Sequence, residues 1–158
     1  MKFFLSLAGI ALIFSACDSN RVYETNKDFA DRTWKIKDTA QFIFNVKDIG
    51  PKYNLLYQVR NSLDYPYSRI FVTYQLQDST GKEIEKKLIS GYLFEEKTGQ
   101  PTGNSGLGDL YDHRFPLISD YSFQQPGKYK LTLQQTMRTD TLEGVLAIGV
   151  RVEKSEAK

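Results

Sequence analysis

Apolar and polar residues alternate along five segments of the chain. These segments are residues 41–46, 53–60, 70–77, 129–134 and 145–152. In the first of them, Phe42 and Phe44 share one face and Ile43 lies on the other. Because successive side chains of a strand point to opposite faces of a sheet, this period of two predicts strands that bury one face. In the last segment it predicts a core-facing row of Leu146, Ile148, Val150 and Val152.

Turn signals separate these segments. Gly or Pro stands within residues 49–51, 78–81 and 125–127, and these are the residue types that tight turns favour. A weaker pattern over residues 83–89 includes Lys86 and Lys87, which suits an exposed edge strand. No long segment has helical periodicity. We therefore predict one all-β domain over residues 28–154, a single β-sandwich of the jelly-roll or the immunoglobulin-like kind.

The first 16 residues have the three parts of a secretory signal peptide. Lys2 gives a positive start, residues 3–14 are mostly apolar, and the small residues Ser15 and Ala16 follow. This order is typical of a segment that is cleaved during export. The apolar run is shorter than the roughly 20 residues that a membrane-spanning helix needs. We therefore expect cleavage after Ala16 rather than a permanent membrane span.

Cys17, the only cysteine of the chain, stands directly after this cut site. Ser15-Ala16-Cys17 resembles the lipobox of bacterial lipoproteins, in which the cysteine sulfur receives diacylglycerol and the new amino terminus is then usually acylated. Phe14 stands where the lipobox more often has Leu. The alternative is an ordinary secreted protein with an incidental cysteine. One acyl chain holds a protein only marginally, whereas two or three form a stable anchor. We predict a lipidated Cys17, a polar tether up to residue 27, and a short tail over residues 155–158.

The composition of the mature chain excludes some partners. Removal of 16 of the 158 residues leaves 142, enough for one domain with a core. Lys2 is the only charged residue removed, so 20 Lys and Arg stand against 19 Asp and Glu. This near-neutral balance gives no indication of nucleic-acid binding or of electrostatic attraction to anionic lipid. The ten Tyr and ten Phe favour half-buried, pleated surfaces.

Residues 95–113 are the longest stretch without a strand pattern, and loops of this length are often functional. The glycines here lack the Lys, Ser/Thr and helix of a phosphate-binding loop. Asn104, Asp109 and Asp112 could offer oxygen ligands to calcium, but their spacing is not that of an EF-hand, and one His supplies no zinc set. We interpret the acids as residues that cap and turn the loop, and we expect no metal or other cofactor.

Residues 61–67 form a second dense patch between two predicted strands. Asn61 and Asp64 can bond to the local backbone, and Pro66 fixes a turn. Exposed Tyr65 and Tyr67 could instead stack on sugars or anchor a protein partner. The candidate interaction surface therefore comprises Asn61, Asp64, Tyr65, Tyr67, Gly106, Gly108, Asp109, Tyr111, Asp112 and His113.

The chain offers little for catalysis. His113 is the only histidine, the only cysteine is predicted to carry lipid, and no Gly-x-Ser-x-Gly elbow occurs. Paired carboxylates such as Asp64 with Asp109 remain an alternative, since such pairing is spatial and not readable from spacing. We predict that the protein is not an enzyme.

Five segments together resemble, in their order, the GldH family of gliding-motility lipoproteins. They read CDSNRVYE from residue 17, VRNSLDYPY from 59, GLGDLYD from 106, MRTDTLEGV from 137 and GVRVEK from 149. The resemblance spans essentially the whole mature chain. The charged residues 83–87 and the length of the loop before Gly106 are the visible departures.

The resemblance implies a membrane-anchored accessory protein of the Bacteroidetes gliding apparatus, which is tied to export of surface adhesins by the type IX secretion system. It implies other envelope proteins of this machinery as partners, and it brings no catalytic or cofactor residues. The alternative is a glycan-binding envelope lipoprotein with Tyr65, Tyr67 or Tyr111 as stacking platforms. The residues after Cys17 lack the Lys or Gln-Ala start, followed by acids, that resembles a surface-export signal, so we expect a domain that faces the periplasm.

Overall fold

The computed structural model describes residues 18–156, and these residues form strands and connecting loops. The strands are β1 (Arg21–Asp28), β2 (Thr33–Lys35), β3 (Ala40–Val46), β4 (Tyr53–Ser62), β5 (Arg69–Gln77), β6 (Glu83–Tyr92), β7 (Asn104–Ser105), β8 (Leu110–Tyr121), β9 (Gly127–Gln135), β10 (Thr141–Glu143) and β11 (Val145–Lys154). Within the described range, no helix is long and apolar enough to cross a membrane. The predicted signal peptide and Cys17 lie outside this range.

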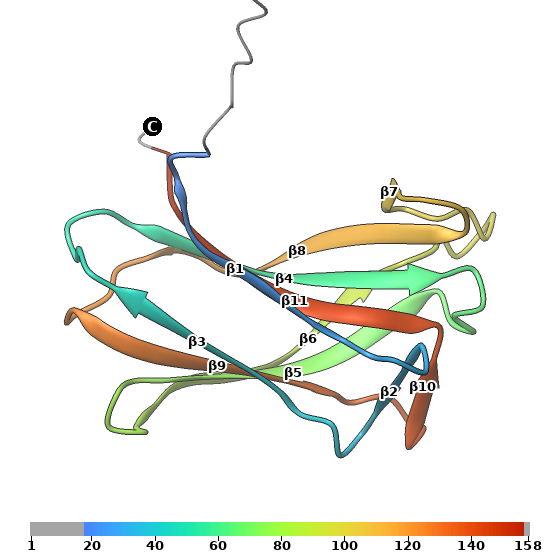
Figure 1. Ribbon diagram of the computed structural model, residues 1–158, viewed down its shortest axis with the longest axis horizontal. Coiled ribbons are helices and arrows are strands. Elements are labelled where there is room, and N and C mark those ends of the chain that lie inside the picture. Colours follow the sequence, from blue (N-terminus) through green and yellow to red (C-terminus); the bar gives the residue numbers. More distant parts are fainter. Residues whose placement is uncertain (1–17, 157–158) are drawn as a thin grey trace, which may run out of the picture.

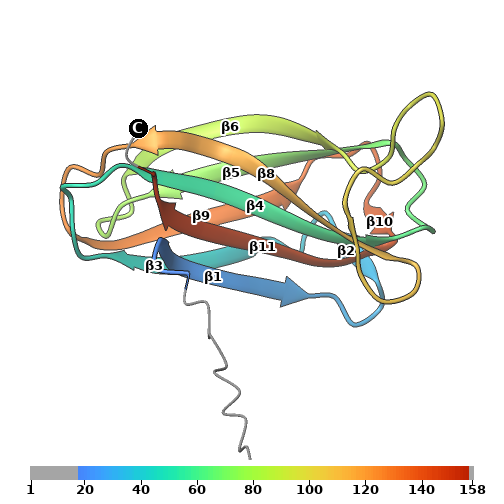
Figure 2. The same cartoon turned by 90° about the horizontal axis from the view of Figure 1, so that it is seen from above.

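Two antiparallel sheets stack face to face (Figures 1 and 2). The five-stranded sheet, here called the front sheet, has the order β1-β11-β4-β8-β7. The four-stranded sheet, the back sheet, has the order β3-β9-β5-β6. A short ribbon of β10 and β2 lies at one end of the sandwich (Figure 1). The predicted all-β sandwich is confirmed.

The pairing of the long strands identifies a jelly roll. Leaving out the short β2, β7 and β10, the first strand pairs with the last (β1 with β11), the second with the seventh (β3 with β9), and so on inward to β5 with β6. This is one long antiparallel ribbon, folded so that β11 also meets β4 and β9 also meets β5. The structure therefore decides for the jelly roll over the immunoglobulin-like sandwich.

The strands predicted from alternation are confirmed and their apolar faces form the core between the sheets. Phe42 and Phe44 are buried while Ile43 faces solvent. The segment with Lys86 and Lys87 is indeed an edge strand, since β6 ends the back sheet. Side chains of both sheets meet in one continuous cluster, so each sheet stabilises the other by burial of its apolar face.

In the predicted core row of β11, Ile148, Val150 and Val152 are confirmed as buried, but Leu146 is wrong. Leu146 is only half-buried, whereas Val145 is fully buried beside Ile148. The register of β11 against β4 shifts between Val145 and Ala147. Such a bulge adds a residue to one strand and reverses which side chains face inward, so Val145 takes the place expected of Leu146.

Most of the predicted tether, residues 18–27, belongs to the front sheet. Arg21–Asp28 is strand β1, paired with β11 at the edge of the front sheet. Tyr23 packs against the core, whereas Glu24 faces the other way. Its polar sequence suits an edge strand with a solvated outer face, which is why composition alone suggested a tether.

The predicted loop over residues 95–113 also ends too late. Tyr111, Asp112 and His113 belong to strand β8. Its alternation is broken by Pro116 and by shifts of register opposite Leu55 and Leu56. Only the two-residue β7 flanks the outer side of β8, and irregularities of this kind are typical of strands at or near a sheet edge.

Candidate functional site on the outer face of the front sheet

Rows of outward-facing side chains cross the front sheet perpendicular to its strands. The strand register places Asn26, Gly149, Gln58 and Arg114 in one row. The next row contains Asp28, Ala147, Arg60 and Asp112. Side chains that are opposite each other in neighbouring strands lie close enough to interact, so residues from four strands meet on this face.

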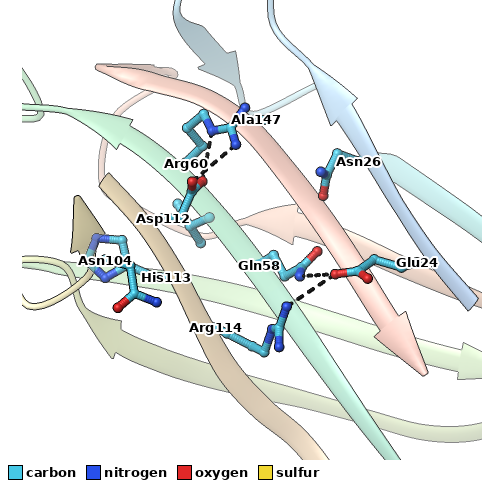
Figure 3. A pocket seen from close by; sticks show the side chains of 10 residues that line it. Glu24, Asn26, Gln58, Arg60, Asn104, Asp112, His113, Arg114 and Ala147 are labelled. Carbon is cyan, nitrogen blue, oxygen red and sulfur yellow. Dashed lines mark hydrogen bonds and ion pairs between the residues drawn. The ribbon is translucent and has the colours of Figure 1, made fainter. Parts of the chain in front are cut away.

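Strand β11, which lies between β1 and β4, contributes almost no side chain to these rows, because it carries Gly149 and Ala147 there. The taller side chains of β1, β4 and β8 therefore surround a hollow of about 420 Å³ (Figure 3). A Cβ atom at position 149 would lie 1.8 Å from the Asn26 Oδ1 atom, so only glycine lets Asn26 lie over β11. We call this site the polar hollow; its charged and amide lining includes Glu24, Asn26, Gln58, Arg60, Asp112 and Arg114.

Glu24 is the centre of a hydrogen-bond network in the polar hollow. Gln58 Nε2 donates to Glu24 Oε1 over 2.6 Å and Arg114 Nη2 donates to the same oxygen over 3.2 Å (Figure 3). Arg151 Nη1 and Arg21 Nη1 donate to Oε2 over 2.9 and 3.2 Å. Burial on its own raises the pKa of Glu24, but Gln58, Arg21 and Arg151 outweigh it and hold the pKa below its ordinary value.

Arg151 is the buried partner in this network, with its side chain only 8% exposed. It bonds Glu24, donates from Nε to Glu153 Oε2 over 2.5 Å, and pairs with the Asp18 carboxylate. Burial opposes its charge, yet Asp18 and Glu153 raise the pKa of Arg151 above its ordinary value. Three carboxylates thus compensate one buried guanidinium, as a buried charge requires.

Arg60 and Asp112 form another wall of the polar hollow. Arg60 Nε lies 2.8 Å from Asp112 Oδ1, and Arg60 Nη2 lies 3.1 Å from Oδ2. This two-point pairing fixes both planar groups. The side chains are 45% and 47% exposed, so water screens the pair and its net contribution to stability is small.

His113 lies at the wall of the polar hollow, on the buried side of β8. It stacks on Phe115 with ring centroids 5.7 Å apart, and its Nδ1 lies 3.5 Å from Thr102 Oγ1. Within residues 18–156, its Nε2 has no hydrogen-bond partner. Burial lowers the pKa of His113 to about 4, so the ring is neutral at pH 7. It also lines a second cavity of about 490 Å³ that opens between β6 and β8.

Three residues of the predicted interaction surface lie in the interior. Asn61, Tyr65 and His113 are 0%, 4% and 6% exposed, so their prediction as surface residues is wrong. Tyr65 donates its hydroxyl to the Arg69 carbonyl and stacks on Phe94. The turn before β11 packs on this corner: a Cβ atom at Gly144 would lie 2.4 Å from the Tyr65 nitrogen. Tertiary packing therefore covers a segment that is locally polar and aromatic.

The structure does bring the two predicted segments together. Asn61 pairs with Tyr111 across β4 and β8, so both segments lie at the same end of the sandwich (Figure 1). We call residues 63–68 and 93–109 the distal loops. Leu63, Tyr67 and Leu107 are exposed here, Leu107 by 91%, and Asp64, Gly106 and Gly108 are exposed beside them. Asp109 lies 3.9 Å from Arg32 Nη1, so this carboxylate has a cationic neighbour.

The sequence placed Asp112 and His113 in the candidate surface, but sequence reasoning missed the other charged residues of the polar hollow. Glu24, Arg114 and Arg151 are far apart in the chain. Glu24 and Arg151 belong to segments that resemble the family, but no pattern of spacing marks the three as members of one site. The only local signal was the polar phase of a predicted strand, in which Gln58 and Arg60 stand opposite the apolar face. Strand order decides which polar side chains of different strands become neighbours. The alternation of apolar and polar residues does not reveal that order.

Solved structures offer only a distant likeness. The structure of the infectious bursal disease virus Gx strain has a TM-score of 0.46 and 15% sequence identity, and the match covers 95% of this chain and 36% of that chain. At this TM-score the likeness carries no weight for function.

Sequence comparison is far more specific. The family described as GldH lipoprotein matches residues 21–152. The chain is 30% identical over 152 residues to a protein of Christiangramia forsetii named gliding motility lipoprotein GldH homolog, covering 92% of this chain and 91% of that protein. It is 26% identical over 153 residues to the gliding motility lipoprotein GldH of Flavobacterium johnsoniae, covering 92% of each. Since the family match begins at the start of β1 and ends within β11, the resemblance read from the sequence is confirmed, and this chain belongs to the GldH lipoprotein family.

Proposed function

We propose that this protein is a non-catalytic component of the envelope machinery for gliding motility, held at a membrane by acyl chains on Cys17 with its domain in the periplasm. The match over residues 21–152 carries this proposal, because it includes all of the jelly roll except the last two residues of β11 rather than a shared fragment. The relatives with motility names align over 92% of this chain. A link to type IX secretion is part of the same proposal and rests on the family resemblance.

The chemistry of the polar hollow supports a non-catalytic role. A general acid works best with a pKa raised towards the operating pH. The pKa of Glu24 is instead lowered by its donors, and Asp112 is held by Arg60 at two points. Glu24 is therefore kept charged, and both carboxylates are engaged by donors, which suits recognition or stability better than proton transfer.

The distal loops are the proposed contact surface for other envelope proteins. They expose Leu63, Tyr67 and Leu107 close to polar groups, and apolar or aromatic anchors within a polar rim are typical of protein interfaces. This surface replaces the broader one predicted from sequence, since Asn61, Tyr65 and His113 are buried.

Complementation of a deletion strain of the native host tests the anchor and the role together. We expect the Cys17→Ala protein to leave the membrane fraction and to restore no colony spreading, whereas the neighbouring Ser19→Ala variant restores both. Mass spectrometry of the mature amino-terminal peptide should show acyl chains on Cys17. Full spreading with an unacylated Cys17→Ala protein would contradict the proposal.

A pull-down from native membranes tests the contact surface. We expect Tyr67→Ala and Leu107→Ala to lose envelope partners that wild type retains. Leu88→Ala is the matched control, because Leu88 is also exposed but lies on β6 of the back sheet. Identical partners for all of these stable variants would remove the distal loops from the proposal.

Glycan binding is a second candidate function, and the polar hollow with its neighbouring cavity favours it. The two share Asn104, Asp112, His113 and Arg114, which offer the donors and acceptors that sugar hydroxyls need. Tyr92, half-exposed in the second cavity, adds an aromatic ring, although the Arg69 guanidinium carbon lies over one of its faces, 4.0 Å from the ring centroid. Titration of the domain with soluble oligosaccharides by NMR should shift resonances around β8, and Asn104→Ala should weaken the effect. Unchanged spectra at millimolar saccharide would exclude this candidate.

A further inference from the structure

Residues 18–20, which directly follow the proposed lipidation site, contact the end of strand β11. The backbone nitrogen of Arg21 donates to the Asp18 carbonyl over 3.2 Å, and that of Lys154 donates to the Asn20 carbonyl over 2.8 Å. The Asp18 carboxylate pairs with the buried Arg151. Residues 18–20 are therefore bound to β11 by backbone and side-chain contacts, and do not act as a free spacer.

This leaves almost no chain between the lipid and the protein. A trans peptide places neighbouring Cα atoms about 3.8 Å apart, so Cys17 lies within one residue of the fixed Asp18. The polar headgroup region of one leaflet is about 5–8 Å thick. An acylated Cys17 sulfur at the level of the headgroups thus brings the Asp18 end of the sandwich into the same layer.

We propose that this end of the jelly roll docks directly on the lipid headgroup layer, with the β3–β4 turn, residues 47–52, as its second contact. The inference deepens the proposed function and rests on acylation of Cys17. It assigns Arg151 a further task, since its pair with Asp18 holds the anchored segment against the sheet.

The β3–β4 turn lies beside the anchored segment. The backbone nitrogen of Ser155 donates to the Lys52 carbonyl over 2.8 Å, and Lys154 Nζ lies 3.9 Å from Asp48 Oδ2. Lys154 in turn bonds Asn20. In Figure 1 the start of β1, the end of β11 and the connection from β3 to β4 share one end of the molecule. The turn and the anchor therefore meet the membrane together.

Ile49 makes this turn suited to a bilayer surface. It is 45% exposed at the tip of the turn, with Lys47 and Lys52 on either side. An exposed apolar side chain can enter the boundary between headgroups and acyl chains, while flanking lysines extend towards phosphates. Acids at this end, among them Asp48 and Asp120, balance the lysines, so the partner is a zwitterionic headgroup layer and no anionic lipid is required.

Docking of one end directs the other end away from the bilayer. Tyr53 at the start of β4 pairs with Lys154, and Ser62 at its end pairs with Leu110 next to the distal loops. A ten-residue strand is about 33 Å long, and β4 has ten residues. The distal loops are thus held about this far from the headgroups, in position to meet soluble or membrane-distal partners.

Depth-dependent quenching tests the docking. Full-length lipoprotein purified from the native host is placed in phosphatidylethanolamine–phosphatidylcholine vesicles, with one fluorophore on Ile49→Cys or on Leu107→Cys. Since Cys17 carries lipid, the new thiol is the only one that reacts. A nitroxide on the lipid headgroup should quench the label at position 49 at least fivefold more strongly than the label at position 107. Addition of 0.5 M salt should leave the ratio unchanged.

The matched control inserts twelve Gly and Ser residues between Cys17 and Asp18. A flexible linker of this length has an end-to-end distance of about 20 Å, so the inserted protein should quench equally at both positions. Equal quenching without the insertion, in protein whose mass shows acylated Cys17, would overturn the docking and leave the anchor intact. A mass without acyl chains would overturn the anchor and the docking together.

Discussion

The front and back sheets bury similar inner faces but carry different outer faces. On the outer face of the back sheet, side chains make exposed hydrogen bonds, such as the one between Thr73 and Thr136. Ile43 and Leu88 face solvent there. On the front sheet, Arg151 is buried among carboxylates and Glu24 has four donors. A charge that loses water must find partners. The outer face of the front sheet therefore carries a network of partly buried, paired charges, whereas the outer face of the back sheet carries side chains exposed to solvent.

This difference between the outer faces originates in the inner strands of the two sheets. On β11, Gly149 and Ala147 leave room above the sheet, and neighbouring side chains fold over that room. The inner strands of the back sheet, β9 and β5, carry full side chains outward, such as Thr132 and Gln75. Among the described residues, β5 lines none of five surface hollows, and β9 lines one of them only at its first three residues, Gly127, Lys128 and Tyr129. Small residues on one strand thus decide which face can gather charges.

Truncation of a buried residue should destabilise the protein equally in either sheet. This is the largest effect on stability that we expect. Ile148 on β11 and Leu131 on β9 are both fully buried. Truncation to Ala leaves a cavity and removes buried methyl groups, so each variant should lose about 4 kcal/mol of unfolding free energy. Urea denaturation of both variants checks this. A loss at one position below about 1.5 kcal/mol would show that the two sheets do not share one core.

Substitutions on the two outer faces should differ in their effect on stability, and this difference should be somewhat smaller than the loss from truncation in the core. Arg151→Met removes the cation that compensates three carboxylates, and should cost about 3 kcal/mol. Lys130→Met, on the outer face of β9, has no ion pair among residues 18–156 and should change stability by less than about 0.5 kcal/mol. Equal effects in chemical denaturation would contradict the contrast between the faces.

The pH dependence of stability tests the contrast between the two sheets further, because His113 is buried on β8 of the front sheet. Its folded pKa of about 4 lies below the ordinary 6.5, so between these values the unfolded chain binds a proton that the folded protein does not. Stability therefore falls as pH falls through 6.5, by about 2 kcal/mol between pH 7 and pH 5. Urea denaturation at both pH values should show this loss, and His113→Phe should remove most of it. An equal loss in the variant would assign the dependence to other groups.

The smallest effect should come from the exposed Arg60–Asp112 pair. A double-mutant cycle with Arg60→Ala and Asp112→Ala should give a coupling of about 0.5 kcal/mol, because water screens the pair. In 1 M salt the coupling should be nearly lost. A coupling above about 2 kcal/mol would mean that the wall of the hollow is as strongly desolvated as Arg151.

Parts of the fold were predictable because their signal is local. Burial of Phe42 and Phe44 follows from a period of two within a few residues, and the exposed β6 follows from its lysines. Strand β8 was missed because Pro116 and a shifted register hide its alternation. The burial of Tyr65 was missed because a turn some 80 residues later, at Gly144, packs on it; no local rule reports such a contact.

By itself the sequence determined the period-two strands, the all-β class, the family and the cysteine at which an anchor is proposed, since each is written in neighbouring residues or in an ordered set of motifs. The tertiary structure alone decided the jelly-roll strand order, the short anchor segment and the meeting of Asp18, Glu24 and Arg151. The physical reason is that the pairing of β1 with β11, and the side-chain bonds of Arg151 to Glu24 and Asp18, join residues more than a hundred positions apart. Alternation shows which way a side chain points, and only the pairing of strands shows what it meets.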